Sequence, residues 1–167
     1  LLQKDFPVLA PEEFLGRHLL ILIDMAQAVA FAHSRGIVHR DLKPSQVMVG
    51  QFGEVVLMDW GLAVYVGDSR SAEDSSGFSA AEIPRPETAS SPAGTPTLMA
   101  PEQALDTAMG VTPLTDIYLL GGTLYFMLTG AFPHRAQASL LAVKQSHLTE
   151  EVEPPESRAP GREIAGI

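Results

Sequence analysis

Apolar residues between positions 11 and 35 recur at the spacing of one helical face. They are Leu15, Leu19, Leu22, Ile23, Ala26, Val29 and Ala30. A period of about 3.6 residues is typical of a helix that packs one side against a core. Gly36 follows directly and favours a helix stop, because glycine adopts the left-handed backbone of a C-terminal cap without strain. The pattern therefore predicts one long helix from Pro11 to Arg35.

Two short β-prone runs come next. Val47–Val49 and Val55–Met58 flank residues 50–54, which contain Gly50 and Gly53. Glycines supply the backbone conformations that tight turns need. The pattern therefore predicts a small β-hairpin.

The second half of the chain alternates between polar and apolar segments. Residues 67–94 are rich in Ser, Ala, Glu and Pro and predict a mobile acidic loop. Residues 117–128 are almost continuously apolar, follow Thr115-Asp116 and precede Gly130, which predicts a helix at the centre of a core. We expect one more helix over residues 136–147 and a Pro- and Glu-bearing tail over residues 150–167.

Composition excludes several classes of protein. The chain has 167 residues, 46% of them hydrophobic, which suits one globular domain or part of one. Because it has no cysteine, disulfides and thiolate metal sites are excluded, and we expect a cytoplasmic location, with membrane anchoring of the full-length protein left open. The formal net charge of −9 argues against a nucleic-acid partner. The longest apolar stretch, Ile117–Leu128, is too short to span a bilayer, so we expect no membrane segment.

Four motifs follow one another along the chain. Each has a plain alternative when taken alone, such as a surface turn or a helix N-terminal carboxylate. They are His39-Arg40-Asp41-Leu42-Lys43-Pro44 with Gln46, then Asp59-Trp60-Gly61, then Gly94-Thr95-Pro96 with Met99-Ala100-Pro101-Glu102, then Asp116 with Tyr118 and Gly121. The first joins a possible proton acceptor, a phosphate-directed cation and a rigid turn. The plain alternatives do not explain why the four motifs occur in this order, with a hairpin after the first and an apolar helix after the last.

In this order the motifs resemble those of a bacterial serine/threonine protein kinase of the eukaryotic, or Hanks, type. The resemblance covers about residues 11–162. It implies a mainly α fold with a small β-hairpin, in which residues 1–167 form a partial kinase domain: a C-terminal lobe with the catalytic loop at 39–46, the activation segment at 59–102 and the central helix at about 116–129. We expect the N-terminal β lobe to be absent, because no Gly-x-Gly-x-x-Gly motif occurs in the sequence.

The resemblance also implies roles for single residues. Asp41 would orient the proton of a substrate hydroxyl, Lys43 would reach the transferring phosphate, and Thr95 would hydrogen-bond near both. Gln46 and Asp59 would hold Mg²⁺. The remaining roles are adenine contact for Met48, hydrophobic packing for His39 and Trp60, a phosphate contact for Arg40, and structural support from Gly61, Glu102 and Asp116.

The implied activity is transfer of phosphate from ATP to Ser or Thr hydroxyls of a protein substrate, once an N-terminal lobe completes the cleft. Gln46 departs from the family's Asn by one methylene, and we expect it to weaken metal binding. The alternative is a pseudokinase or truncated lobe that binds proteins without catalysis. A kinase dimer in the full-length protein also remains open. Phosphorylation in the acidic loop, weighed equally against a plain solvated insertion, is a further hypothesis for Ser75, Ser76, Ser79, Thr88, Ser90 and Ser91.

Overall fold

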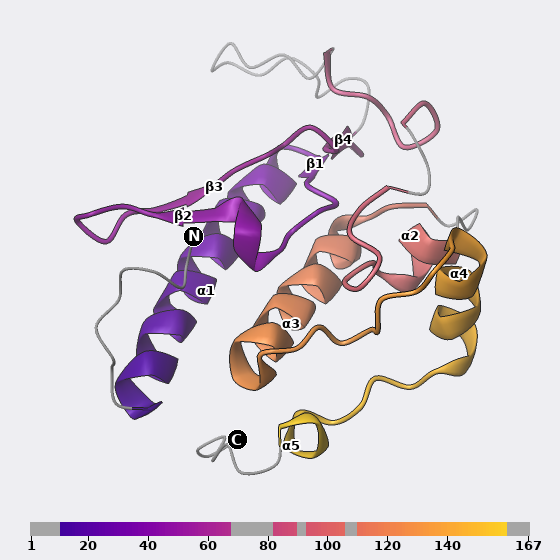
Figure 1. The fold of residues 1–167 in the computed structure, drawn as a ribbon. Coiled ribbons are helices and arrows are strands. Elements are labelled where there is room, and N and C mark those ends of the chain that lie inside the picture. The colour runs from indigo at the N-terminus through magenta and orange to yellow at the C-terminus, as the bar shows by residue number, and fades with distance from the viewer. Residues whose placement is uncertain (1–10, 68–81, 90–92, 106–109, 160–167) are drawn as a thin grey trace.

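Two long helices lie side by side in the protein. The computed structural model describes residues 11–67, 82–89, 93–105 and 110–159. Helix α1 (Pro11–Ser34) packs against α3 (Pro113–Thr129), and short helices and two small sheets lie along this pair without enclosing it (Figure 1). The expected mainly α fold with little β structure is confirmed.

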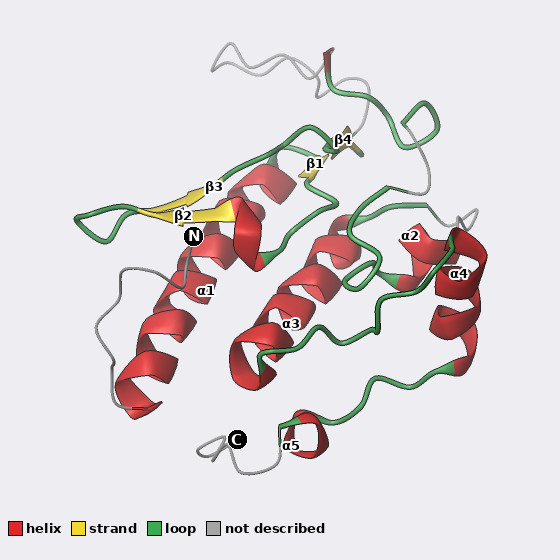
Figure 2. Cartoon of the chain, in the orientation of Figure 1, coloured by secondary structure: helices red, strands yellow, loops and turns green. Residues whose placement is uncertain are grey.

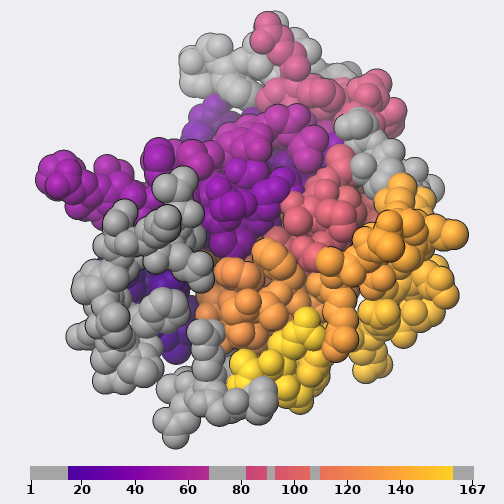
Figure 3. All heavy atoms as spheres, viewed as in Figure 1, coloured from indigo at the N-terminus to yellow at the C-terminus, as the bar shows by residue number. Residues whose placement is uncertain are grey.

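The predicted hairpin is present and slightly shorter than expected. Strands β2 (Val47–Val49) and β3 (Val55–Leu57) pair antiparallel, with Met48 opposite Val56. The hairpin projects from the body of the protein (Figure 3). Its base carries the chain from the catalytic-loop motif to Asp59.

A second strand pair was not predicted. β1 (Ile37–Val38) runs antiparallel to β4 (Val64–Tyr65), next to the end of α1 (Figure 2). Two-residue strands are too short to show an alternating pattern, so nothing local in the sequence indicates them. The pair holds the chain before Asp41 beside the chain that follows Asp59.

Helix α1 agrees closely with its prediction. It ends at Ser34, one residue before the expected limit, and Gly36 has a φ of 71°. The Gly36 N–H donates to the carbonyl of His33 over 2.9 Å. The chain can therefore reverse immediately into β1.

Helix α3 begins earlier than predicted. Thr112 and Thr115 form a capping box, in which each side chain accepts from the other end of the turn, and Pro113 occupies the first turn. These residues move the start of the helix from about 116 to Pro113. The C-terminal cap is Gly130, with a φ of 74°.

The expectation that α3 is buried on all sides is wrong. Leu119 is 1% exposed, whereas Leu114 is 74% and Ile117 55% exposed. α1 and the small helix α5 (Pro155–Arg158) both pack on α3, but within the described residues the face bearing Leu114 and Ile117 is largely uncovered. A uniformly apolar pattern does not show how many neighbours a helix has.

The C-terminal elements also differ from their predictions. The helix expected over 136–147 is α4 (Leu140–Thr149), because the Ser139 side chain accepts from Ala142 N–H and caps it there. The expected tail contains α5, and the Tyr125 hydroxyl donates to the carbonyl of Glu153 over 2.8 Å. α4 packs on the short helix α2 (Pro101–Leu105).

One hydrophobic core joins these elements to the first motif. Leu42, inside that motif, is fully buried. Its buried neighbours in the core are Ile21, Met25, Val29, Val47, Leu57, Leu98 and Leu119. The loop bearing Asp41 is therefore anchored from within by its own leucine.

Helix α1 also changes the expectation about membranes. Leu15–Ser34 is long and apolar enough to cross a bilayer by length and composition alone, so Ile117–Leu128 is not the strongest candidate. A core helix passes the same test. Met25 and Val29, at most 1% exposed, face the core, whereas Leu20 is 65% and Ile23 51% exposed, so α1 buries one face and leaves the other uncovered among the described residues.

Candidate active site

Segments distant in sequence bring the predicted site residues together. Asp41 and Lys43 lie in the loop between β1 and the short 3₁₀ turn Pro44–Gln46. Asp59 follows β3, and Thr95 precedes α2. The hairpin and the strand pair thus place residues from three parts of the chain around one loop.

Asp41, Lys43 and Thr95 form a closed set of hydrogen bonds. The Lys43 ammonium donates to Asp41 Oδ2 over 2.6 Å and to Thr95 Oγ1 over 2.8 Å. Thr95 Oγ1 donates to Asp41 Oδ1 over 2.7 Å. Each carboxylate oxygen of Asp41 therefore has one partner, and the carboxylate is held in a single orientation beside a cation.

Gln46 and Asp59 face each other at the exposed side of the loop. Gln46 Nε2 donates to Asp59 Oδ2 over 2.8 Å. A carboxylate and an amide oxygen are hard ligands suited to Mg²⁺, and a half-turn of the Gln46 amide would bring its oxygen to the Asp59 side. The pair therefore fits an ion that completes its shell with phosphate and water. No group of three or more His, Cys, Asp or Glu side chains among the described residues offers an all-protein metal site.

His39 and Trp60 lie against each other beneath this site. Their ring centroids are 4.6 Å apart, and Trp60 Nε1 donates to the Leu57 carbonyl. The Asp41 N–H donates to His39 Nδ1 over 3.3 Å, so Nε2 carries the proton and donates to the Met58 carbonyl over 3.1 Å. The imidazole thus links the loop bearing Asp41 to the end of β3.

Two described residues other than glycine have positive φ angles, and both lie in the site. Arg40 has a φ of 75° and Asp59 a φ of 60°. Such backbone costs about 1–3 kcal/mol and persists where surrounding contacts impose it. Arg40 is 4% exposed, and this burial lowers the pKa of its guanidinium, which donates to the Leu62 carbonyl.

Asp116 supports the loop from α3. Its two carboxylate oxygens accept the backbone N–H groups of His39 and Arg40, each over 2.9 Å. His33, at the end of α1, contributes a third contact, from Nε2 to Asp116 Oδ2 over 2.8 Å. Sequence reasoning missed His33, because nothing near it in the sequence indicates a partner 83 positions away.

The other predicted residues lie further from Asp41. Met48 is 52% exposed on the hairpin. Glu102 Oε1 accepts from the Thr115 hydroxyl over 2.6 Å and so ties α2 to the start of α3. A Cβ on Gly61 would lie 3.3 Å from Asp59 Oδ1, which makes the turn tight for a larger residue.

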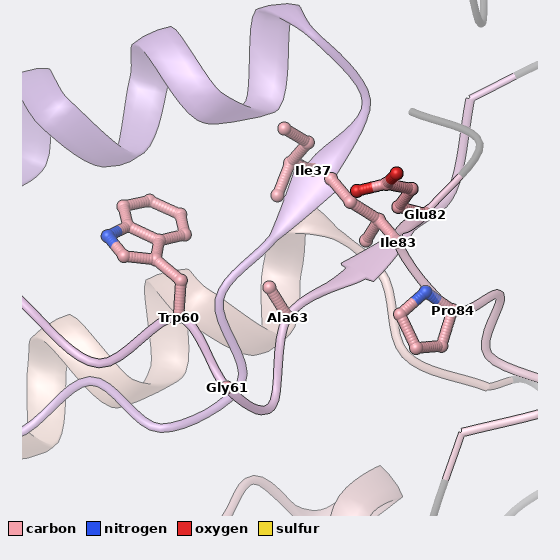
Figure 4. Close-up of a pocket in the computed structure, with 7 residues that line it drawn as sticks. All are labelled: Ile37, Trp60, Gly61, Ala63, Glu82, Ile83 and Pro84. Atoms are coloured by element: carbon pink, nitrogen blue, oxygen red, sulfur yellow. The ribbon is translucent and has the colours of Figure 1, made fainter. Parts of the chain in front are cut away.

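Trp60 also lines a cleft of about 410 Å³. Its walls are mainly apolar, with Trp60 facing Ile37 and Ile83 and one carboxylate at the rim (Figure 4). The lining residues are Ile37, Trp60, Gly61, Ala63, Glu82, Ile83 and Pro84. Because Asp41, Lys43 and Thr95 do not line it, this cleft is separate from the set that these three residues form.

Two imidazoles, those of His134 and His147, pack beside the segment that follows Thr95. The Tyr118 hydroxyl lies 2.7 Å from His134 Nε2, and the rings of His134 and His147 are 4.1 Å apart. His147 Nε2 reaches the Met99 carbonyl over 3.0 Å. Burial, together with His147, lowers the pKa of His134 to about 4.

The hypothesis of phosphorylation in the acidic loop falls mostly outside the structure. Ser75, Ser76, Ser79, Ser90 and Ser91 lie outside the described residues. Thr88 is described, and its hydroxyl donates to the Arg85 carbonyl over 3.1 Å.

Comparison with known proteins agrees with this geometry. The protein kinase domain family matches residues 16–162. The serine/threonine-protein kinase PknD of Protochlamydia amoebophila is 37% identical over 158 residues, covering 91% of this chain and 16% of that protein. PknD of Chlamydia felis is 38% identical over 170 residues, covering 98% of this chain and 17% of that protein. The chain thus spans about one sixth of these relatives.

The family match covers most of the chain, and the two relatives are 37% and 38% identical to it. The chain belongs to the protein kinase family, among the bacterial serine/threonine kinases of the Hanks type.

Proposed function

We propose that this chain is the C-terminal lobe of a serine/threonine protein kinase that transfers the γ-phosphate of ATP to a hydroxyl of a protein substrate. The observation that carries this proposal is the hydrogen-bonded set of Asp41, Lys43 and Thr95. Asp41 is the base, Lys43 the cation and Thr95 the hydroxyl. Gln46 lies in the turn that follows Lys43, and Asp59 follows β3. Phosphoryl transfer needs positioning and charge neutralisation more than covalent chemistry, and this set supplies both.

In the proposed reaction, the substrate hydroxyl oxygen bonds to the γ-phosphorus while the bond to the β,γ-bridging oxygen breaks and ADP leaves. Asp41 orients the hydroxyl and takes its proton. Lys43 balances charge on the transferring phosphoryl oxygens. Thr95 keeps the Asp41 carboxylate pointed at the hydroxyl, because it holds Oδ1.

Gln46 and Asp59 are the residues that would hold Mg²⁺ in this proposal. When bound, the ion neutralises phosphate charge. Asp59 supplies the stronger ligand, because it is a carboxylate. Gln46 supplies an amide oxygen on a side chain with one more rotatable bond than Asn, which costs more entropy to order.

The exposed hairpin supports the assignment as a C-terminal lobe. Met48 is 52% and Val56 43% exposed, although both are apolar strand residues. We propose that adenine contacts Met48 and that a small β lobe covers this face. Exposed apolar strand residues that lie together are typical of a surface that binds something.

Phosphate transfer by the full-length protein tests the proposal. We expect radiolabel from γ-labelled Mg·ATP to enter serine and threonine of a protein substrate, and Asp41→Asn to reduce it by about a hundredfold or more. The matched control is Asp24→Asn, because Asp24 is exposed on α1 and belongs to none of the site's hydrogen-bonded sets. A folded protein that binds Mg·ATP and transfers nothing would contradict the proposal.

The second candidate is an interaction module without catalysis. The observation that favours it is the hydrogen bond from Gln46 Nε2 to Asp59 Oδ2, which occupies the carboxylate that the metal needs. Calorimetry on the full-length protein separates the candidates. A folded protein with neither magnesium-dependent ATP binding nor transfer is expected only of the interaction module.

A further inference from the structure

Gln103 is a buried amide that the sequence motifs do not assign. It lies in α2 and is 3% exposed. A buried amide must find partners for its oxygen and both of its N–H groups. Gln103 Oε1 accepts from Ala100 N–H over 3.1 Å, and Nε2 donates to the carbonyls of Arg40 over 2.8 Å and Ala93 over 2.9 Å.

The contact with Arg40 completes a clamp on a strained peptide. Arg40 has a φ of 75°, its N–H donates to Asp116 Oδ1, and its carbonyl accepts from Gln103. Two side chains from different helices therefore hold this residue from both sides. Because Asp41 follows Arg40 directly, the clamp sets the direction in which the Asp41 side chain leaves the loop.

The contact with Ala93 holds the segment that carries Thr95. Gly94 lies between them with a φ of 130°. A Cβ on Gly94 would lie 3.1 Å from Gln103 Nε2 and 3.2 Å from the Arg40 carbonyl, so the three groups are in close contact. One amide group thus bridges the segment bearing Thr95 and the loop bearing Asp41.

We propose that Gln103 is a positioning residue for phosphoryl transfer. It holds the backbone near Asp41 and the backbone near Thr95 at the separation at which the hydrogen bond between these two side chains forms. This inference rests on the proposed function. It differs from general stabilisation, because Gln103 contacts the two backbones at either side of the Asp41–Thr95 hydrogen bond. Losing the bridge should impair the chemical step more than the binding of ATP.

The test compares Gln103→Met and Gln103→Glu in the full-length protein. Methionine keeps the length and removes the amide, and glutamate keeps an acceptor for Ala100 but turns a carboxylate oxygen towards two carbonyls. We expect kcat to fall about ten- to a hundredfold in both variants, with the KM for ATP changed less than about twofold. Assays run well below each unfolding temperature.

The matched control is Gln145→Met, because Gln145 is exposed on α4. A kcat within about twofold of wild type in Gln103→Met, or a kcat loss equalled by a rise in KM, would overturn the inference. An inactive wild type counts against the proposed function instead. In that case amide hydrogen exchange decides the inference: Gln103→Met should accelerate exchange at Arg40, Leu98 and Met99 but not in α3, and unchanged exchange would refute it.

Discussion

Asp116 Oδ1 accepts a hydrogen bond from the backbone N–H of Arg40 over 2.9 Å, across 76 positions of sequence. The bond crosses from the first turn of α3 to the loop that carries Asp41. Asp116 is fully buried, so its charge depends on these donors instead of on water. The loop that carries Asp41 is consequently fixed to α3 by the Asp116 side chain.

Asp116→Asn should lower the free energy of unfolding by about 2–4 kcal/mol. The asparagine amide would turn an N–H₂ group towards one of the donors, so at least one charged hydrogen bond is lost and one buried group is left without a partner. Urea denaturation of the chain measures the loss. Asp24→Asn, on the exposed side of α1, is the control, and an equal effect from both substitutions would refute the brace.

Thr95→Val should reduce kcat about tenfold, whereas Thr95→Ser should stay within about threefold of wild type. Valine removes the hydroxyl that donates to Asp41 and accepts from Lys43, and serine retains it. Steady-state kinetics on the full-length protein gives the comparison. Equal rates for the two variants would show that the hydroxyl plays no part.

Gln46→Asn should raise turnover several-fold when Mg²⁺ is limiting. The shorter amide has one rotamer fewer to order and reaches the ion with less adjustment, which the strict octahedral geometry of magnesium rewards. The readout is kcat as a function of magnesium concentration. Gln51→Asn, at the exposed hairpin turn, controls for general effects of the substitution, and an unchanged magnesium dependence would mean that the longer side chain is harmless.

Residues 1–167 alone should bind Mg·ATP weakly. They contain no glycine-rich phosphate loop, and Met48, the proposed adenine contact, is 52% exposed. Isothermal calorimetry on this chain checks the expectation. Tight binding that requires magnesium would show that one lobe suffices.

Stability should fall as the pH drops from about 6.5 towards 4. The pKa of His134 is lowered from 6.5 to about 4, chiefly by burial and further by His147. In this window the unfolded chain binds the proton and the folded chain does not, so the stabilisation is complete above pH 6.5 and is lost below it. The contribution is about 2–3 kcal/mol.

His134→Gln keeps an acceptor for the Tyr118 hydroxyl and removes the titrating group. Urea denaturation of both proteins at pH 7 and pH 4 measures the difference. The variant should lose about 2–3 kcal/mol less than wild type over this range. Equal losses would place the pH dependence in other groups.

Local patterns predicted the parts of the fold that are themselves local. The period of α1, the glycines of the β2–β3 hairpin and the apolar run of α3 each lie within one segment, and each element is present. The first residues of α3 and α4 differ from the predicted ones, because the prediction did not consider the capping residues Thr112 and Ser139. Motif order alone also pointed to the kinase family, because each motif is a short contiguous string.

Only the tertiary structure decided which atoms meet. The partners of Asp116 include His33, the carbonyl that Gln103 holds belongs to Arg40, and Glu102 accepts from Thr115. None of these pairs has a sequence signal, because a hydrogen bond between distant residues depends on how whole helices pack. The exposure of Ile117 likewise depends on which neighbours α3 has. The sequence by itself thus determined the elements and the kinase motifs, while long-range packing determined the geometry that joins Asp41, Lys43 and Thr95.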